Sequence, residues 1–221
     1  MTLFALLSRQ RRFVYLIVGI LSVAGVWAAL RTSPWWWLIG GPLLVIAVWL
    51  LVFFRDPLRT GPRGDGVVIA PADGKVVSVV EADEPMYLKA RAQRVSIFMS
   101  VFDVHVNRYP VAGRVELVRY NPGQFLHAAA DKASLDNEQA SIGIRGPRGP
   151  VLVRQIAGLI ARRIVTDGKI GDNVGQATRL GMIRFGSRVD VFVPVARRPV
   201  VRVKVGDRVA AGATVLAEFG T

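Results

Sequence analysis

Gly186 and Ser187 are the residues with the clearest potential for chemistry, because they interrupt two strand-like runs within residues 179–194. Glycine permits backbone angles that other residues avoid, and no side chain shields its carbonyl. A serine that follows it in a strained turn can attack that carbonyl with its own Oγ, which converts the peptide bond into an ester. Elimination of the ester leaves a dehydroalanine, which hydrolyses to a pyruvoyl group. A bulge between two strands is the other interpretation of this dipeptide.

His105 is the candidate general acid or base, because the ordinary histidine pKa of about 6.5 suits proton transfer near neutral pH. The alternation of apolar and polar residues over residues 94–107 predicts a strand that carries Asp103 and His105 on one face, where Asp103 could orient the ring. The chain has one other histidine, His127, and no cysteine. These counts exclude a thiolate metal site and a cysteine nucleophile, and we predict no metal site.

Two long apolar runs lie in the first 54 residues, which contain no acidic residue. Residues 13–30 and 35–54 would each span roughly 27–30 Å as a helix, about the thickness of a hydrocarbon core. We therefore expect residues 1–54 to form a transmembrane helical hairpin rather than a signal peptide. Arginines before the first run and after the second outnumber Arg31 in the turn, which predicts that both ends lie in the cytoplasm.

Residues 55–66 form a linker rich in proline and glycine, and residues 67–221 read as a mainly β (α+β) domain. Residues 67–80 resemble the first half of a biotinyl or lipoyl barrel, and residues 205–219 resemble the second half. We therefore expect a barrel-sandwich-hybrid-like domain with a large insertion between its halves. A short helix is expected at residues 156–165.

Residues 55–221 carry 25 basic and 16 acidic residues, and their net charge of +9 fits a domain held at an anionic membrane surface. No nucleic-acid-binding motif accompanies that charge, so we expect no nucleic-acid partner.

The chain resembles the phosphatidylserine decarboxylases, specifically the short, membrane-associated bacterial and archaeal branch. The resemblance covers most of residues 55–221 and rests on blocks in the same order. They are APADGK (70–75), FMSVFDVHVNRYP (98–110), NPGQFLHAAADKASLDNE (121–138), residues 155–165, RFGSRVDVF (184–192) and the final VGDRV.

This resemblance implies a proenzyme that cleaves itself between Gly186 and Ser187 into chains 1–186 and 187–221, which remain associated. Ser187 would become a covalent pyruvoyl cofactor that forms a Schiff base with phosphatidylserine in the membrane. Loss of CO₂ would then give phosphatidylethanolamine. We expect the catalytic domain on the cytoplasmic face of the cell (inner) membrane, and we expect the cleaved pair to form a homodimer.

The resemblance also implies roles for other residues. Asp73 matches an aspartate that longer relatives use in self-cleavage, although a plain turn former is the alternative. His127, Arg108 and Lys132 are candidates for substrate binding. Three positions depart from the longer relatives: Arg108 stands where they have a second histidine, and Phe185 and Arg188 stand where they have leucine and threonine. The base for self-cleavage therefore stays open.

Two other functions remain to be weighed against the decarboxylase. One is a non-catalytic, membrane-tethered barrel, either an adaptor or a lipoyl-like carrier with a modified Lys75 or Lys132. The other is the same processing chemistry with a different amine-bearing substrate. An intact chain would favour the first, whereas a chain broken at Ser187 would favour a pyruvoyl enzyme.

Overall fold

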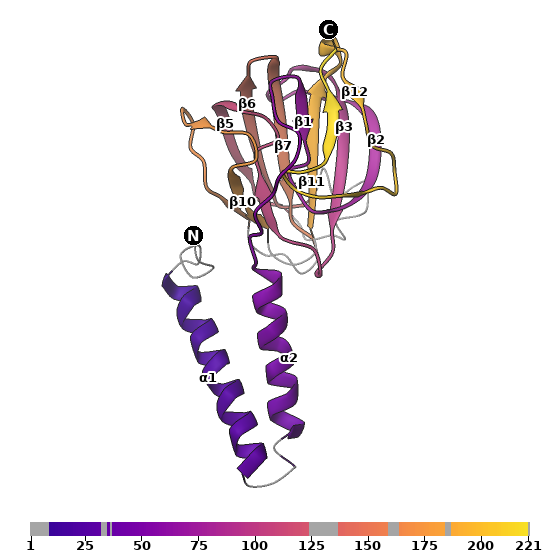
Figure 1. The fold of residues 1–221 in the computed structure, drawn as a ribbon. Helices are drawn as coiled ribbons and strands as arrows, with labels where there is room; N and C mark the ends of the chain where they lie inside the picture. The colour runs from indigo at the N-terminus through magenta and orange to yellow at the C-terminus, as the bar shows by residue number, and fades with distance from the viewer. Residues whose placement is uncertain are drawn as a thin grey trace. The chain divides into compact units, whose positions relative to one another are not determined.

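The structure is a computed structural model that describes residues 9–31, 35, 37–123, 137–158, 164–183 and 187–220. The chain divides into two compact units, Met1–Asp56 and Pro57–Thr221. In the first unit, helix α1 (Arg9–Arg31) packs against helix α2 (Trp37–Phe53), as Figure 1 shows. The helices approach closely at two glycines, because a Cβ on Gly40 would lie 3.1 Å from the backbone of Gly25. The expected pair of helices is confirmed.

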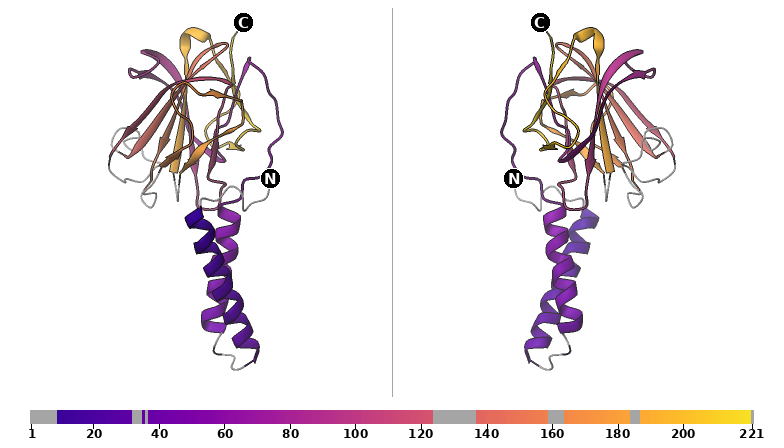
Figure 2. Two further views of the ribbon diagram at one scale, coloured as in Figure 1. Left: turned by 90° about the vertical axis from the view of Figure 1, so that its left-hand side faces the viewer. Right: turned by 90° about the vertical axis from the view of Figure 1, so that its right-hand side faces the viewer.

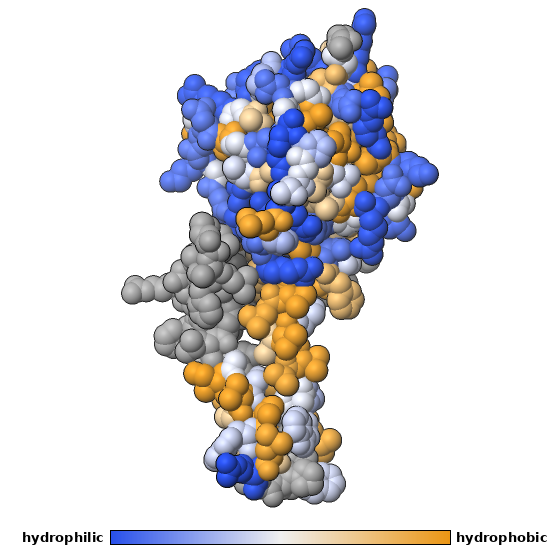
Figure 3. Space-filling model, in the orientation of Figure 1, coloured by the Kyte–Doolittle hydropathy of each residue, from blue (hydrophilic) through white to orange (hydrophobic). Residues whose placement is uncertain are grey.

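Apolar side chains are exposed along α2, including Leu38, Ile39 and Val45 (Figure 3). Within the described part of the chain, no helix combines the length and the apolar character needed to cross a membrane. The transmembrane character of the hairpin stays a prediction.

The second unit is mainly β, as expected, and its largest sheet is curled (Figure 2). That sheet has eight strands in the order β13-β2-β3-β11-β7-β6-β5-β9, and two smaller sheets have the orders β1-β14-β12 and β4-β10-β8. All pairings between the described strands are antiparallel. The strands are β1 (Val67–Ile69), β2 (Gly74–Glu84), β3 (Ala90–Met99), β4 (Val106–Arg108), β5 (Gly113–Asn121), β6 (Gln139–Gly146), β7 (Gly149–Ile156), β8 (Ile164–Thr166), β9 (Asn173–Val174), β10 (Arg179–Ile183), β11 (Ser187–Pro194), β12 (Val200–Val201), β13 (Arg208–Val209) and β14 (Val215–Glu218).

The two ends of the β unit pair with each other, although more than 120 residues separate them. Val67 in β1 lies opposite Glu218 in β14, and Gly74 in β2 lies opposite Val209 in β13. The segments that resemble the two halves of a lipoyl-type barrel are therefore joined by backbone hydrogen bonds, and the residues between them build most of the large sheet.

Strand β11 occupies the middle of the large sheet, between β3 and β7, and all eight of its residues are buried. Val189 and Val191 belong to the main hydrophobic core on one face. Phe192, which points to the other face, packs in a second cluster with Ala92 and Leu152. Because both faces are covered, the strand that begins at Ser187 is held on all sides.

Two expected elements differ in the structure. The strand expected over residues 94–107 is broken, because β3 ends at Met99 and β4 begins at Val106. Asp103 causes the break: its Oδ2 accepts the Ser100 N–H at 2.8 Å and its own N–H donates to the Ser100 carbonyl at 3.0 Å, which closes a turn.

The prediction of a helix over residues 156–165 is also wrong, at both ends of the segment. Ile156 is the last residue of β7, and the segment from Ile164 is strand β8. The middle of that segment, residues 159–163, lies outside the described residues. Pairing with β10 overrides the local helical pattern at Ile164 and Val165.

Candidate active site

Ser187 is fully buried at the first position of β11. Its Cα partner across the sheet is Met99, the last residue of β3, and its Oγ donates to Met99 Sδ at 3.4 Å. Gly186, the other half of the expected cleavage site, lies outside the described residues. The hydroxyl expected to act as nucleophile therefore sits at a strand end, out of contact with solvent.

His105 is also fully buried, in the segment that leads into β4. Its Nδ1 lies 2.9 Å from the backbone carbonyl oxygen of Asp103. A carbonyl only accepts, so Nδ1 carries the hydrogen and Nε2 carries the lone pair. Burial lowers the pKa of His105 from 6.5 to about 4, although the bond to Asp103 and its charge oppose that shift. The ring is neutral at pH 7 and can accept a proton at Nε2.

Asp103 orients the His105 ring with its backbone carbonyl, not from a shared strand face as expected. The strand is interrupted at this point, so the alternation that placed both side chains on one face does not apply. The Asp103 carboxylate binds the Ser100 N–H and, at 3.0 Å, the Arg208 guanidinium.

Asp73 joins three separate parts of the β unit. Its Oδ1 accepts the Ala211 N–H at 2.7 Å, and its Oδ2 forms a 2.5 Å ion pair with Arg59. The next residues along the chain place it relative to Ser187, because Lys75, Phe98 and Arg188 form one row across β2, β3 and β11. Asp73 lies two residues before Lys75 of this row, and β3 stands between β2 and the strand that begins at Ser187. These contacts agree with Asp73 acting as a turn former. A function of Asp73 in self-cleavage stays a prediction.

Arg108 binds two backbone carbonyls. Its guanidinium donates to Ala177 O at 2.9 Å and to Pro57 O at 3.0 Å, which ties the start of the linker to the turn before β10. A role in substrate binding stays a prediction for Arg108. His127 and Lys132, the other residues expected to bind substrate, lie outside the described residues.

A group of buried amides beside Ser187 was not predicted from the sequence. Asn107 Nδ2 donates to the same Met99 sulfur, at 3.6 Å, and Gln155 Nε2 donates to Asn107 Oδ1 at 2.8 Å. Both amide residues are fully buried, on β4 and β7. The available signal for Gln155 was its position, with Arg154, between the apolar residues Val153 and Ile156 of a strand-like run.

Arg188 is buried as well, directly after Ser187. Its guanidinium makes a two-point ion pair with Asp190, at 2.6 and 3.1 Å, and donates to Ser96 Oγ on β3 at 3.0 Å. The residue that departs from the longer relatives therefore fixes the start of β11 to its neighbouring strand.

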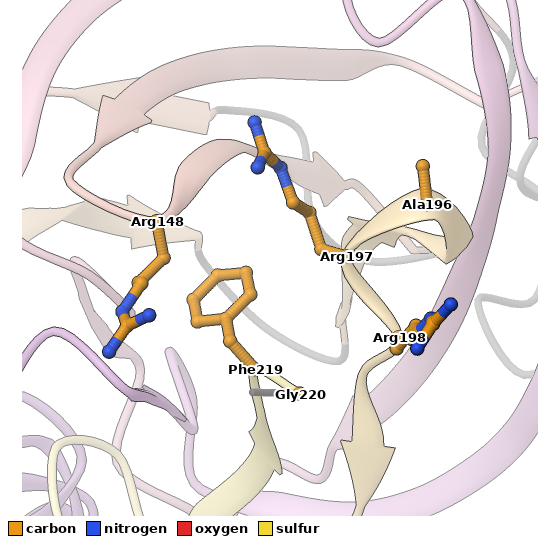
Figure 4. Close-up of a pocket in the computed structure, with 6 residues that line it drawn as sticks. All are labelled: Arg148, Ala196, Arg197, Arg198, Phe219 and Gly220. Atoms are coloured by element: carbon orange, nitrogen blue, oxygen red, sulfur yellow. The ribbon is translucent and has the colours of Figure 1, made fainter.

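A cleft of about 440 Å³ lies at the opposite end of β11, and Figure 4 shows its lining. Arg148, Arg197 and Phe219 are among the lining residues. The cleft lies beyond Pro194 rather than at Ser187, so the length of the strand, roughly 23 Å, separates it from the candidate site.

Lys75, the residue considered for a carrier function, lies within β2 and pairs with Arg208 and Phe98 on either side. A modified carrier lysine stands at the tip of a hairpin, so this position does not favour a carrier.

Comparison with known proteins gives consistent matches. A family model described as phosphatidylserine decarboxylase matches residues 46–217. A protein of Azorhizobium caulinodans is 46% identical over 209 residues, which covers 93% of this chain and 84% of the relative. A protein of Ralstonia nicotianae is 45% identical over 202 residues, covering 91% of each. Both relatives are named phosphatidylserine decarboxylase proenzyme.

Proposed function

The chain belongs to the phosphatidylserine decarboxylase family, and we propose from that premise that it is a carboxy-lyase converting phosphatidylserine into phosphatidylethanolamine and CO₂. We propose further that its cofactor is a pyruvoyl group made from Ser187. The observation that carries the proposal is the position of Ser187, buried at the start of a central strand within the matched region.

Self-cleavage begins with Ser187 Oγ, which loses its proton and attacks the carbonyl carbon of Gly186. The C–N bond breaks, the new amino group of residue 187 takes a proton, and an ester joins the two chains. A base then removes the Cα proton of residue 187, and the Oγ–Cβ bond breaks. Gly186 keeps both oxygens as a carboxylate, and residue 187 gains a Cα=Cβ bond. Addition of water and loss of ammonia leave a ketone at its Cα.

The neighbours of Ser187 suit such a carbonyl group. Asn107 brings an N–H donor to the sulfur that the Ser187 hydroxyl contacts, and a carbonyl oxygen accepts from such a donor. When it is bound to the substrate's amine, a pyruvoyl group supplies an electron sink for the electron pair that CO₂ leaves behind.

His105 is our candidate for the proton transfers. The neutral ring offers Nε2 as an acceptor at pH 7, while Nδ1–H stays on the Asp103 carbonyl. A base of this kind takes a proton at Nε2 in one step and returns it in a later one.

The small chain stays in place after cleavage because β11 pairs on both edges. Residues 187–194 pair with β3, and residues 188–192 pair with β7. Both of those strands belong to the large chain, so we propose a stable complex of chains 1–186 and 187–221. We also propose that two such complexes form a homodimer, and light scattering of the solubilised protein tests this separately.

We also propose that the hairpin holds the enzyme at the inner membrane, with the β unit on the cytoplasmic side. Exposed apolar residues on α2 and the arginines that flank the hairpin support this location. The test is whether the full chain stays with membranes after an alkaline wash. Release into the supernatant would contradict the anchor and leave the decarboxylase intact.

The activity is tested with headgroup-labelled phosphatidylserine in mixed micelles. The purified full chain should release labelled CO₂ and form phosphatidylethanolamine, whereas a Ser187→Ala variant should do neither. Conversion by the Ser187→Ala variant would contradict the proposed origin of the cofactor.

A further inference from the structure

Four buried or half-buried side chains form a continuous hydrogen-bonded chain that ends beside Ser187. Thr166 Oγ1 on β8 donates to Gln155 Oε1 at 3.1 Å. Gln155 Nε2 donates to Asn107 Oδ1 at 2.8 Å, and Asn107 Nδ2 donates to Met99 Sδ at 3.6 Å. The Ser187 hydroxyl donates to the same sulfur at 3.4 Å. The steps of self-cleavage given above involve only Ser187, Gly186, a base and water. They assign no function to Thr166, Gln155 or Asn107.

The direction of this chain is fixed at its Met99 end. A thioether has lone pairs but no hydrogen to donate, so Asn107 must turn its NH₂ group toward the sulfur. The Asn107 Oδ1 then faces Gln155, and because this oxygen only accepts, Gln155 must donate from its Nε2. The Gln155 Oε1 is left for Thr166, whose hydroxyl therefore donates. Every amide in the chain thus has one possible orientation, set by its neighbours.

The arrangement leaves a good donor on a poor acceptor. A thioether is a weak acceptor, and a buried amide N–H on such a partner retains much of its capacity for a stronger one. Asn107 shares this acceptor with Ser187, the residue that must lose a proton during self-cleavage. An oxygen that becomes negative at Ser187 would attract the N–H of Asn107 more strongly than the sulfur does.

We propose that Asn107 is a positioning residue for self-cleavage. Its carboxamide, oriented by Gln155 and Thr166, fixes the Met99 thioether that holds the Ser187 hydroxyl and favours the state in which that hydroxyl has lost its proton. The proposal rests on the proposed function, because it concerns the same processing step.

The first test is the Asn107→Asp variant of the full chain, followed by the rate of chain breakage. At pH 8 the ionised carboxylate introduced at this position would have no hydrogen for the sulfur, and we expect cleavage to slow about tenfold or more. Uncleaved protein purified at pH 8 is then moved to lower pH, where a protonated carboxyl regains an O–H donor. Cleavage of the variant should accelerate as the pH falls from 8 to 5, while that of the wild type should not. Cleavage that is as fast as in the wild type, or faster at high pH, would overturn the proposal.

Other titratable or charged groups flank Asn107 and are common to both proteins. His105 precedes it, Arg108 follows it, and β10 brings Arg179, which pairs with Asp167 at 2.7 Å. On β7, Arg154 pairs with Glu84, and on β11, Arg188 pairs with Asp190. In the wild type, burial lowers the pKa of His105 to about 4, so its ring is neutral over most of this pH range. A difference in pH profile between variant and wild type therefore reports position 107.

The second test decides the question even if the Asn107→Asp protein does not fold. Thr166→Val keeps the shape of the side chain and removes the hydroxyl, whereas Thr166→Ser keeps the hydroxyl. We expect slower cleavage in Thr166→Val and recovery in Thr166→Ser, at similar melting temperatures. Equal rates in the two variants would contradict the proposal. A wild-type chain that does not cleave at all would instead contradict the proposed function.

Discussion

The guanidinium of Arg188 and the carboxylate of Asp190 form a fully buried ion pair, with N–O distances of 2.6 and 3.1 Å, at the start of the strand that Ser187 begins. The same guanidinium reaches Ser96 on β3. A buried pair of this kind contributes little net stability, but removal of one partner leaves the other charge uncompensated. Its effect is to fix the segment next to the scissile bond.

Arg188→Met should therefore be strongly destabilising. We expect a loss of about 3–5 kcal/mol, because the Asp190 carboxylate stays buried without its counter-charge. Denaturant unfolding in a Ser187→Ala background, where the chain stays whole, gives the measurement. The double variant Arg188→Met, Asp190→Leu removes both charges and should recover most of the loss. An undiminished stability in Arg188→Met alone would contradict this account of the pair.

His105 should make the fold sensitive to acid. Its pKa is about 4 in the folded protein and about 6.5 when unfolded, so the unfolded chain binds the proton first as the pH falls. The contribution of neutral His105 to the free energy of unfolding is therefore present above pH 6.5. We expect the free energy of unfolding to fall by roughly 3 kcal/mol as the pH falls to 4. Urea unfolding from pH 7.5 to 4 should show this loss in Ser187→Ala, and less of it with His105→Gln added. Parallel pH profiles for the two proteins would be the contrary result.

Substitutions at Asp73 and at Arg59 can show whether Asp73 acts in self-cleavage or only stabilises the turn. Arg59→Met and Asp73→Asn break the same ion pair from opposite sides, and each should cost about 1 kcal/mol because the pair is partly exposed. We expect only Asp73→Asn to slow chain breakage, measured by the appearance of the small chain. Equal slowing in both variants would mean that the ion pair acts structurally.

Gly74 should not tolerate a side chain. Its φ is +154°, and a Cβ there would lie 2.1 Å from the Phe98 carbonyl oxygen, next to the row that contains Arg188. We expect Gly74→Ala to lose roughly 2–4 kcal/mol, read as a lower melting temperature. Gly66→Ala is the matched control, because a Cβ at Gly66 meets no atom within 4 Å. A Gly74→Ala protein as stable as this control would refute the close approach.

Local patterns predicted the elements whose apolar pattern or turn chemistry is explicit. The ADG turn between β1 and β2, and the strand that begins at Ser187, are of this kind. The first and last segments resemble two halves of one barrel, and in the structure they pair, with Val67 opposite Glu218.

Features that depend on distant partners were beyond a reading of the sequence. The alternation over residues 94–107 did not indicate the turn within this segment. That turn depends on one contact, in which the Asp103 carboxylate accepts the Ser100 N–H. Asn107 meets Gln155 only through strand pairings between separate parts of the chain. The sequence indicated Arg188 as a departure from the longer relatives, but it did not predict the burial of this residue, since nothing local indicates that the second face of the sheet is covered.

The most direct test of the central claim is the intact mass of the purified, denatured protein. We predict two chains, residues 1–186 and a 35-residue chain that begins at position 187. The small chain should be lighter than its serine-terminated form by one molecule of ammonia and should react with a carbonyl reagent. A single unmodified mass for residues 1–221 from active protein would contradict self-cleavage at Ser187, and with it the pyruvoyl cofactor.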